Sequence, residues 1–191
     1  PHHLQPKPPA GPRPRRFGKR NSVMDNYQNT LEIYDKIADV YQAKFMDMDL
    51  YNDTYDLFCQ LVEKPNAAIL EIACGPGNIT RYILSKRPDF RVKATDMAPN
   101  MVKLAQINNP TAVCEVMDCR EIDQLTERFD AVICGFCMPY LSKEDCDKLI
   151  RDAANLLNQG GIFYGSAIED DYEKSAYESS SDGKMRMFIY R

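Results

Sequence analysis

A glycine-containing turn between an apolar run and a helical pattern is the segment of this sequence best suited to hold a ligand. The run Ile69-Leu-Glu-Ile-Ala-Cys-Gly-Pro-Gly-Asn-Ile-Thr80 carries an acid, Glu71, before the turn and two glycines, Gly75 and Gly77, within it. Glycine lets the backbone approach a ligand closely, and the first N–H groups of the following helix are free to bind it. The segment therefore predicts a small-molecule site at a strand–helix junction.

The composition of this turn argues against two common phosphate sites. A dinucleotide fingerprint requires a third glycine where Thr80 stands, and a phosphate-binding loop requires a Gly-Lys-Ser/Thr sequence that this turn lacks. An acid such as Glu71 repels phosphates, whereas it suits a cationic amino group. The turn therefore favours a ligand that carries an amino group and no phosphate.

Two further acids stand at the ends of the next two apolar runs. Asp96 lies 19 residues after Gly77, about where a carboxylate accepts both hydroxyls of a ribose. Asp118, in Glu115-Val-Met-Asp-Cys119, ends the third apolar run, a position from which it can accept a hydrogen bond from an exocyclic amine. A ligand with an amino-acid end, a ribose and an adenine, but no phosphate, is S-adenosylmethionine.

Short apolar runs alternate with amphipathic segments along the chain, which predicts an α/β fold built on a parallel sheet. The expected strands are residues 67–73, 92–95, 112–117, 129–134 and 162–165, and the helices among them are residues 78–85, 99–106 and 142–157. Pro99 suits the first position of a helix, and Ser142 with Asp145 approximates a capping box. The run Asn158-Gln-Gly-Gly161 is expected to end the last helix.

One domain is expected behind a distinct N-terminal head. Residues 24–64 predict a helical lid, residues 65–168 the cofactor-binding core, and residues 169–191 a loop (with Ser175 to Asp182 in it) and a terminal strand. Residues 1–23 contain six basic residues, six prolines and no acid. This composition predicts a disordered head or an added extension, with a nucleic-acid arm as the alternative.

The composition excludes several classes of function. Both histidines, His2 and His3, lie in the head, so the folded part has no Ser-His-Asp triad and no histidine-bound metal, and no metal is expected. Beyond residue 23, the chain has 18 basic and 28 acidic residues, and a formal charge of −10 disfavours nucleic acid as a partner. No apolar run approaches the roughly 20 residues of a membrane span, so no membrane partner is expected.

Seven cysteines without a secretory signal indicate a reducing compartment, and the cytoplasm is the expected location. The pair Cys134-Gly-Phe-Cys137 has the spacing of a redox pair or of half a zinc site. It ends an apolar strand instead of starting a helix, and no second such pair completes a zinc site. Both thiols are therefore expected to be packing residues.

The chain from about Tyr27 to Ala167 resembles a class I S-adenosylmethionine-dependent methyltransferase. The resemblance rests on five segments in the same order, residues 71–77, 95–96, 117–119, 129–133 and 158–161. The loop departs from the commonest Glu/Asp-x-Gly-x-Gly-x-Gly form, because Ala73 replaces the first glycine and Asn78 follows Gly77. The resemblance implies a Rossmann-like, mostly parallel sheet with helices on both faces and an N-terminal helical lid.

The resemblance also implies which residues bind the methionine part of the cofactor. The backbone around Ala73, Gly75 and Gly77 would contact it. Glu71 would support that loop or the ligand's amine.

The adenosine part and the methyl group would lie against the ends of the next three strands. Asp96 would hold the ribose, and Met97 would flank the adenine. Asp118 and the backbone N–H of Cys119 would bind the edge of the adenine. The segment from Cys134 to Phe136 would face the sulfonium and the acceptor.

The acceptor is expected to be a small molecule. The segment from Tyr34 to Tyr41 resembles the lid helix of small-molecule methyltransferases, although both tyrosines also suit a helix core. Cys137-Met-Pro-Tyr140 shares two residues with the Asn/Asp-Pro-Pro-Tyr run of amino-group methyltransferases but starts two residues later. Without histidine, the candidate catalytic residues are Tyr34 and Tyr140, alongside a carboxylate or water, and none is assigned as the base.

Two other functions stay open from the sequence: a cofactor-binding module without catalysis, and a nucleotide-linked oxidoreductase, which Thr80 disfavours. Members of the family normally follow the fifth strand with a further helix and an antiparallel strand pair, whereas 26 residues follow Gly165. The sheet is therefore expected to be incomplete at its C-terminal edge, as in the front portion of a longer protein, which would leave the fifth strand unpaired on one side. The oligomeric state is not predicted.

Overall fold

Five strands and the helices between them form the body of the chain. The computed structural model describes residues 18–180 and 183–191, with side chains described from Asn26 onward. In chain order the elements are α1 (Gly18–Lys36), α2 (Ala38–Phe45), α3 (Asn52–Leu61), β1 (Ala68–Ile72), α4 (Asn78–Lys86), β2 (Arg91–Asp96), α5 (Pro99–Asn108), β3 (Val113–Val116), the 3₁₀ helix η1 (Cys119–Gln124), β4 (Phe129–Cys134), η2 (Met138–Tyr140), α6 (Lys143–Leu156), β5 (Leu157–Gly165), η3 (Tyr172–Lys174), β6 (Ala176–Ser179) and β7 (Arg186–Ile189).

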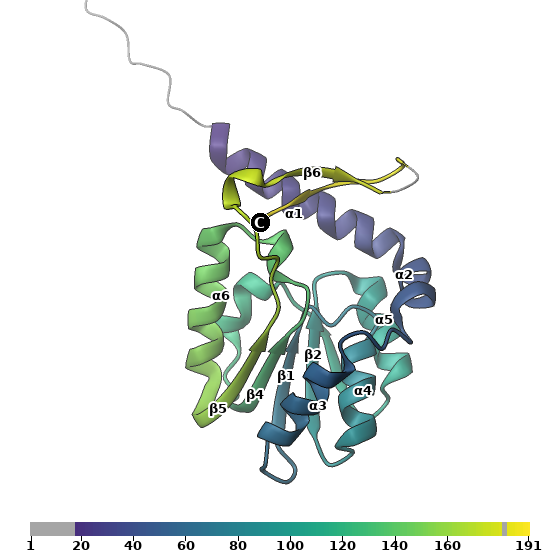
Figure 1. Cartoon of the computed structure of the whole chain (residues 1–191), viewed down its shortest axis with the longest axis vertical. Helices are drawn as coiled ribbons and strands as arrows, with labels where there is room; N and C mark the ends of the chain where they lie inside the picture. The colour runs from purple at the N-terminus through teal and green to yellow at the C-terminus, as the bar shows by residue number, and fades with distance from the viewer. Residues whose placement is uncertain (1–17, 181–182) are drawn as a thin grey trace, which may run out of the picture.

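The main sheet is parallel throughout and has the strand order β3-β2-β1-β4-β5. The chain moves outward from β1 in one direction through β2 and β3, and then in the other direction through β4 and β5 (Figure 1). The carboxyl end of β1 is therefore the point at which the strand order reverses, and in open parallel sheets ligands bind in the crevice at this point.

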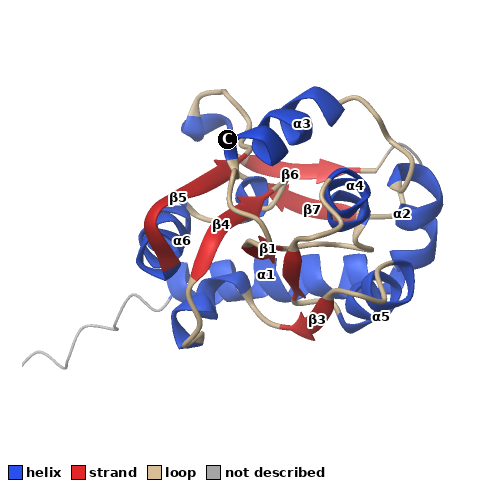
Figure 2. Ribbon diagram, turned by 90° about the horizontal axis from the view of Figure 1, so that it is seen from below, coloured by secondary structure: helices blue, strands red, loops and turns tan. Residues whose placement is uncertain are grey.

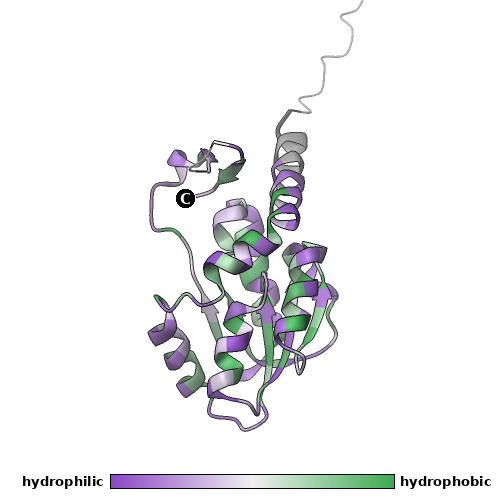
Figure 3. Cartoon of the chain, turned by 90° about the vertical axis from the view of Figure 1, so that its right-hand side faces the viewer, coloured by the Kyte–Doolittle hydropathy of each residue, from purple (hydrophilic) through white to green (hydrophobic). Residues whose placement is uncertain are grey.

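Helices cover both faces of the sheet, as predicted (Figure 2). Because strand side chains alternate between faces, Ile69 and Ile133 pack with residues of α3, α4 and α5, whereas Leu70 and Val132 pack with residues of η1 and α6. In Figure 3 the strands are mostly hydrophobic, while the helices carry hydrophilic residues as well. Within the described part of the chain, no helix combines the length and apolarity needed to cross a membrane.

The helix start signals in the sequence are confirmed. Pro99 occupies the first turn of α5, and the hydroxyl of Ser142 accepts the backbone N–H of Asp145 at 3.2 Å to cap α6. The cap also joins α6 to α1, because the hydroxyl of Tyr27 accepts the N–H of Ser142 at 2.9 Å and donates to the Asp145 carboxylate at 2.5 Å. This local chemistry therefore helps to hold the N-terminal helix against the core.

Helices α1 and α2 lie across the carboxyl edge of the sheet (Figure 1). Two polar contacts attach them to α5: Asp35 accepts the N–H of Asn100 at 2.7 Å, and the amide of Asn108 donates to Gln42 at 2.6 Å. The same Asn108 amide donates to the carbonyl of Pro76 at 2.8 Å, so one side chain joins the lid to the glycine loop.

The start of α1 lies inside the segment that the sequence predicts as the head. The helix begins at Gly18, although the composition predicts a disordered head up to residue 23. Extending a formed helix costs far less than nucleating one, so the helix continues into a basic segment without an apolar pattern. Residues 1–17 lie outside the described residues.

Two predictions near the C-terminus are also corrected. Helix α6 ends at Leu156, within one residue of the prediction, but β5 begins at Leu157 instead of at Ile162. Asn158 to Gly161 therefore lies within β5, where the pairing with β4 is irregular. Part of the predicted loop Ser175 to Asp182 forms β6, which pairs with β7 in a separate antiparallel sheet. Within the described residues, β5 therefore pairs only with β4.

The β6–β7 hairpin packs against the lid instead of extending the main sheet. The side chain of Asn29 in α1 donates to the carbonyl of Arg186 at 2.8 Å, and the N–H of Tyr190 donates to the carbonyl of Pro139 in η2 at 2.7 Å. The rings of Tyr177 and Phe188 contact each other across the two strands, with centroids 5.2 Å apart. The hairpin thereby supports both α1 and the η2 segment.

Candidate cofactor-binding site

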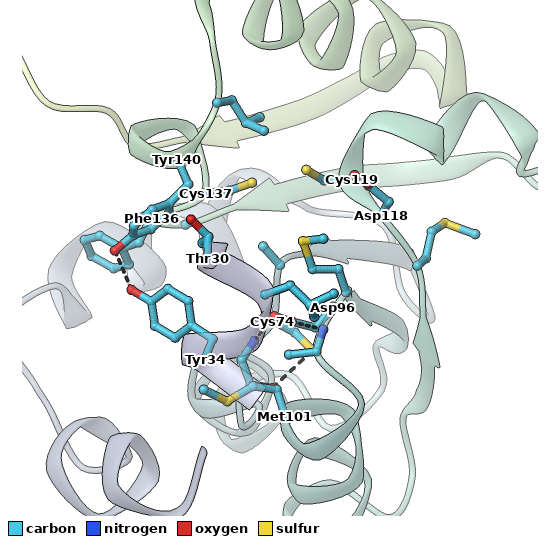
Figure 4. A pocket seen from close by; sticks show the side chains of 18 of the residues that line it. Thr30, Tyr34, Cys74, Asp96, Met101, Asp118, Cys119, Phe136, Cys137 and Tyr140 are labelled. Carbon is cyan, nitrogen blue, oxygen red and sulfur yellow. Dashed lines mark hydrogen bonds between the residues drawn. The ribbon is translucent and has the colours of Figure 1, made fainter. Parts of the chain in front are cut away.

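A cavity opens at the carboxyl ends of β1, β2, β3 and β4, beneath α1 and α2. Figure 4 shows side chains from these strand ends and from α1 directed into it. Of the residues predicted to bind the cofactor, six line this cavity: Ala73, Gly75, Asp96, Met97, Asp118 and Cys119. The structure therefore brings together at one site residues that are up to 46 positions apart in the sequence.

The glycine loop between β1 and α4 has a backbone conformation that favours glycine. Ala73, Gly75 and Gly77 have φ angles of +56°, +54° and +81°. A Cβ atom on Gly77 would lie 2.3 Å from Nδ2 of Asn109 and 3.1 Å from Cα of Ala105. Gly77 does not line the cavity, whereas Ala73 and Gly75 do; Gly77 instead allows α4 to pack closely against α5.

Asp96 connects the end of β2 to the glycine loop. One carboxylate oxygen accepts the N–H of Gly75 and the other accepts the N–H of Ala98, both at 2.9 Å. Burial raises the pKa of Asp96, and the two backbone N–H groups oppose this effect because they stabilise the carboxylate. Each oxygen has a second lone pair, so the carboxylate can still accept hydrogen bonds from a ligand.

Asp118 forms an ion pair with a residue that the sequence analysis did not single out. The Arg120 guanidinium donates to Asp118 through Nε at 2.9 Å, and the Arg120 backbone N–H donates to the same oxygen at 2.9 Å. Burial alone would raise the pKa of Asp118, but the bonds from Arg120 lower it below its ordinary value. The guanidinium also lies 4.2 Å from the ring centre of Tyr27. A basic residue two positions after Asp118 was the available signal.

Glu71 lies outside the cavity, in the interface between β1 and α4. Its side chain is buried and accepts a hydrogen bond from the hydroxyl of Thr80, while Oε1 has no hydrogen-bond partner among the described residues. Burial raises the pKa of Glu71 to about 8. Of the two roles predicted for Glu71, its position suits support of the loop and does not suit contact with the ligand's amine.

Cys134 is also outside the cavity, which corrects the expectation that it faces the sulfonium. Its side chain is fully buried on the face of the sheet that packs against η1 and α6. Because the chain turns after β4, the next three residues, from Gly135 to Cys137, line the cavity in its place. Phe136 stands at this turn with a φ of +61°.

Cys137 and Cys119 lie side by side in the wall of the cavity, with their sulfur atoms directed toward each other (Figure 4). A hydrogen bond with Cys137 and burial raise the pKa of the Cys119 thiol well above its ordinary value. All seven cysteines are free thiols. A raised thiol pKa disfavours thiolate chemistry, so a packing role suits both residues.

The two candidate catalytic tyrosines meet above the cavity. The hydroxyls of Tyr34 in α1 and Tyr140 in η2 are 2.5 Å apart, and their rings form an edge-to-face pair with centroids 5.4 Å apart (Figure 4). Tyr41 packs against Tyr34 at 5.7 Å, and its ring lies 3.8 Å from the position of a Cβ atom on Gly75. Burial raises the pKa of Tyr34 and of Tyr140, and raises the pKa of Tyr41 to about 12. These hydroxyls are protonated at neutral pH, which argues against their action as bases.

The residues of the cavity fit S-adenosylmethionine. The positive φ of Gly75 lets the loop backbone reach the ligand space without a side chain, Asp96 offers lone pairs, and Asp118 lies one strand further along the sheet. Apolar side chains, including Met97 and Met101, provide the flanking surface that an adenine ring needs. No phosphate-binding feature is present in the described lining, where Arg120 is the one cation and pairs with Asp118.

Comparison with known proteins identifies relatives of this sequence. Residues 69–161 match the family model described as a methyltransferase domain. The chain is 27% identical over 114 residues to a putative methyltransferase 235L of Invertebrate iridescent virus 6, covering 60% of this chain and 42% of that protein. It is 33% identical over 75 residues to a malonyl-[acyl-carrier protein] O-methyltransferase of Acetivibrio thermocellus, covering 38% and 26%. A tRNA N(3)-methylcytidine methyltransferase of Schizosaccharomyces pombe is 23% identical over 150 residues, covering 74% and 60%. The chain thus spans between about a quarter and 60% of the length of these relatives.

Solved structures share the fold. The DhpI–SAH complex superimposes with a TM-score of 0.66 at 19% identity, covering 87% of this chain and 79% of that chain. An S-adenosylmethionine-dependent methyltransferase from Clostridium acetobutylicum superimposes with a TM-score of 0.59 at 22% identity, covering 78% and 65%. The family match, the parallel sheet and the glycine loop agree: residues 69–161 form a methyltransferase domain, with the fold that solved S-adenosylmethionine-dependent methyltransferases share.

Proposed function

We propose that this chain binds S-adenosylmethionine in the cavity beneath α1 and α2 and transfers its methyl group to a small-molecule acceptor. The observation that carries the proposal is the convergence of three strand ends on one cavity. Gly75 follows β1, Asp96 ends β2 and Asp118 follows β3, and all three line the same space. This is the side of the sheet on which such folds bind their ligands.

Within this proposal, each residue of the cavity has a separate role. The backbone at Ala73 and Gly75 holds the methionine part, and Asp96 holds the ribose while it fixes the loop through the N–H of Gly75. Met97 flanks the adenine, and Asp118 with the N–H of Cys119 binds its edge. Arg120 orients the Asp118 carboxylate through its hydrogen bonds.

When bound, S-adenosylmethionine supplies a methyl group on a positively charged sulfur, and the acceptor's lone pair displaces the sulfur in line. The protein's part is to place the acceptor and to exclude water, and positioning alone contributes several kcal/mol. The lid suits this task, because Tyr34, Tyr41 and Tyr140 close the cavity on the side away from the sheet. Asp35 and Gln42 hold the lid on α5.

The negative charge of the chain and the closing of the cavity by the lid both favour a small-molecule acceptor over nucleic acid. Beyond residue 23 the formal charge is −10, whereas binding to nucleic acid depends on neutralising its phosphates. The tRNA methyltransferase among the relatives keeps RNA as the alternative acceptor. We place the reaction in the cytoplasm, because all seven cysteines carry free thiols.

A non-catalytic cofactor-binding module is the second candidate. It is supported by the raised pKa values of Tyr34 and Tyr140, which leave the cavity wall without an evident base. Titration calorimetry with S-adenosylhomocysteine and NAD tests binding, and transfer of a labelled methyl group to a mixture of small metabolites tests catalysis. Binding of S-adenosylhomocysteine without transfer would favour the module, and tighter binding of NAD would contradict both candidates.

We expect the substitution Asp96→Asn to weaken binding of S-adenosylhomocysteine by about 10- to 100-fold, or about 1.4–2.8 kcal/mol. Asparagine keeps one acceptor oxygen but loses the charge and the second acceptor. The assignment to the ribose has its own test in the 2′,3′-dideoxy analogue of the ligand, measured by calorimetry with both proteins. If Asp96 binds the ribose, the substitution weakens binding of the analogue much less. Equal losses for both ligands would mean that Asp96 acts only through the loop.

A further inference from the structure

The wall of the cavity on the lid side is aromatic. Tyr34, Tyr41, Phe136 and Tyr140 come from α1, α2, the turn after β4 and η2, and all four line the cavity. We call these four residues the aromatic wall. The Tyr34 ring stands nearly perpendicular to the rings of Tyr140 and Tyr41, at interplanar angles of 82° and 79°. The walls of a box for a small cationic group have this arrangement, because ring faces attract positive charge.

Phe136 is held in the aromatic wall by its surroundings. Its backbone has a φ of +61°, and its N–H donates to the hydroxyl of Ser166 at 2.8 Å. Its ring packs edge-to-face on Tyr51, with centroids 4.8 Å apart. A phenylalanine in the left-handed region persists only where its neighbours fix it, and such strain concentrates at functional sites.

The charges in the lining do not suit an anionic acceptor. Among the described residues that line the cavity, the charged ones are Asp96, Asp118 and Arg120. The guanidinium of Arg120 is engaged by Asp118 and lies over Tyr27, at the adenine side of the proposed site. The aromatic wall itself carries no cation that would pair with a carboxylate or a phosphate.

The protonation states of the lining do not suit an acceptor that needs a strong base. The raised pKa values keep the hydroxyls of Tyr34, Tyr41 and Tyr140 protonated at neutral pH. Asp96 holds the ribose in the proposed function, and its two oxygens also accept backbone N–H groups. An alcohol needs a base in the site because it must lose its proton during methyl transfer, whereas an ammonium group can lose a proton to water beforehand and then attack as the neutral amine.

Resting on the proposed function, we propose that the acceptor is an amine, whose nitrogen is bound against the aromatic wall. The neutral amine nitrogen forms the new bond to the methyl carbon as the carbon–sulfur bond breaks and its electron pair goes to sulfur. The nitrogen then carries the positive charge, and it loses a proton to water after transfer. The aromatic wall therefore faces one positive charge throughout, first on sulfur and then on nitrogen. With an oxyanion acceptor this charge would vanish, and the rings would repel the acceptor beforehand.

A binding experiment separates this inference from the proposed function. The chain is saturated with S-adenosylhomocysteine, which has an uncharged sulfur, and titrated with benzyltrimethylammonium or with its neutral isostere neopentylbenzene. We expect the cation to bind at least 10-fold more tightly than the isostere. Equal affinity, tighter binding of the isostere, or no binding of the cation would overturn the inference and leave the proposed function standing. Failure to bind S-adenosylhomocysteine would overturn the proposed function, and the inference with it.

Three variants test whether the preference for the cation arises at the aromatic wall. Phe136→Leu keeps an apolar side chain at the same backbone position and is expected to reduce the preference for the cation about 5-fold, whereas Phe136→Tyr keeps the ring and the preference. Tyr82→Leu removes an aromatic ring on α4 that does not line the cavity, and it is expected to leave the preference unchanged. A preference that survives Phe136→Leu in a folded protein would contradict the role of Phe136. Circular dichroism reports folding, and the preference of the unmodified chain stands as a test without the variants.

The rate of methyl transfer gives a second test, with three acceptors that have the same aromatic ring and different reactive groups. Benzylamine, benzyl alcohol and benzoate are each incubated with the chain and labelled S-adenosylmethionine, and methylated product is measured by mass spectrometry. We expect the amine to be methylated at least 10-fold faster than the other two. Faster methylation of the alcohol or the carboxylate would overturn the inference.

Discussion

Replacing Gly75 with valine is expected to abolish binding of S-adenosylhomocysteine, with a loss of affinity of at least about 100-fold, while the helices and the sheet remain. Two effects combine at this position. The φ of Gly75 is +54°, in the left-handed region that a β-branched residue strongly disfavours. The valine side chain would also project into the cavity that Gly75 lines, next to the ring of Tyr41. Calorimetry measures the affinity, and circular dichroism shows that the fold is kept.

Gly160 offers a matched control for the backbone part of this effect. Its φ is +76°, and a Cβ atom there would meet nothing within 4 Å. Gly160→Val therefore introduces similar backbone strain at a position that does not line the cofactor cavity. We expect it to lower the melting temperature but to leave the affinity within about 2-fold. If Gly75→Val folds and binds S-adenosylhomocysteine normally, the glycine loop is not the site.

The parts of the fold that the sequence predicts well are those that depend on neighbouring residues. The predicted bounds of β4 agree with the structure, and those of β1 and β2 differ by one residue at each end. Ser142 and Pro99 mark helix starts through hydrogen bonds and backbone angles within one turn. The predicted start of β5 at Ile162 is wrong, because a glycine-rich segment such as Asn158 to Gly161 suits both the end of a helix and an irregular strand.

The site likewise contains features that neighbouring residues determine and features that depend on distant contacts. Strand ends of a parallel sheet meet at one edge, so the predicted positions of Ala73, Gly75, Asp96 and Asp118 converge as the topology requires. The contact between Tyr34 and Tyr140 joins residues 106 positions apart and depends on how α1 docks, which no local pattern specifies. The direction in which a side chain at a strand end points also depends on contacts between segments that are distant in the sequence. Cys134 was therefore placed in the site although its side chain points into the core.

Glu71 gives the second large effect, a dependence of stability on pH. Burial raises the pKa of this carboxyl to about 8, against about 4.5 in an unfolded chain, and the nearby groups Asp96, Cys74 and Tyr55 add no positive charge. Between these two pH values the native state holds a proton that the unfolded state has lost. Raising the pH through this interval therefore favours unfolding, and the dependence disappears below about pH 4.5 and above about pH 8.

We expect Glu71→Gln to remove this dependence, because glutamine resembles the protonated carboxyl and can still accept the hydrogen bond from Thr80. Urea unfolding at pH 5, 6.5 and 8 measures the free energy of unfolding of both proteins. The free energy of the unmodified chain relative to the variant should fall by roughly 2–4 kcal/mol across this range, since each pKa unit corresponds to about 1.4 kcal/mol. Glu169→Gln changes an exposed glutamate and should show no such trend.

A constant difference between the unmodified chain and Glu71→Gln would mean that Glu71 is ionised in the native state at pH 5. Its carboxylate would then need a partner beyond Thr80 in the interface between β1 and α4, where Oε1 has no partner among the described residues.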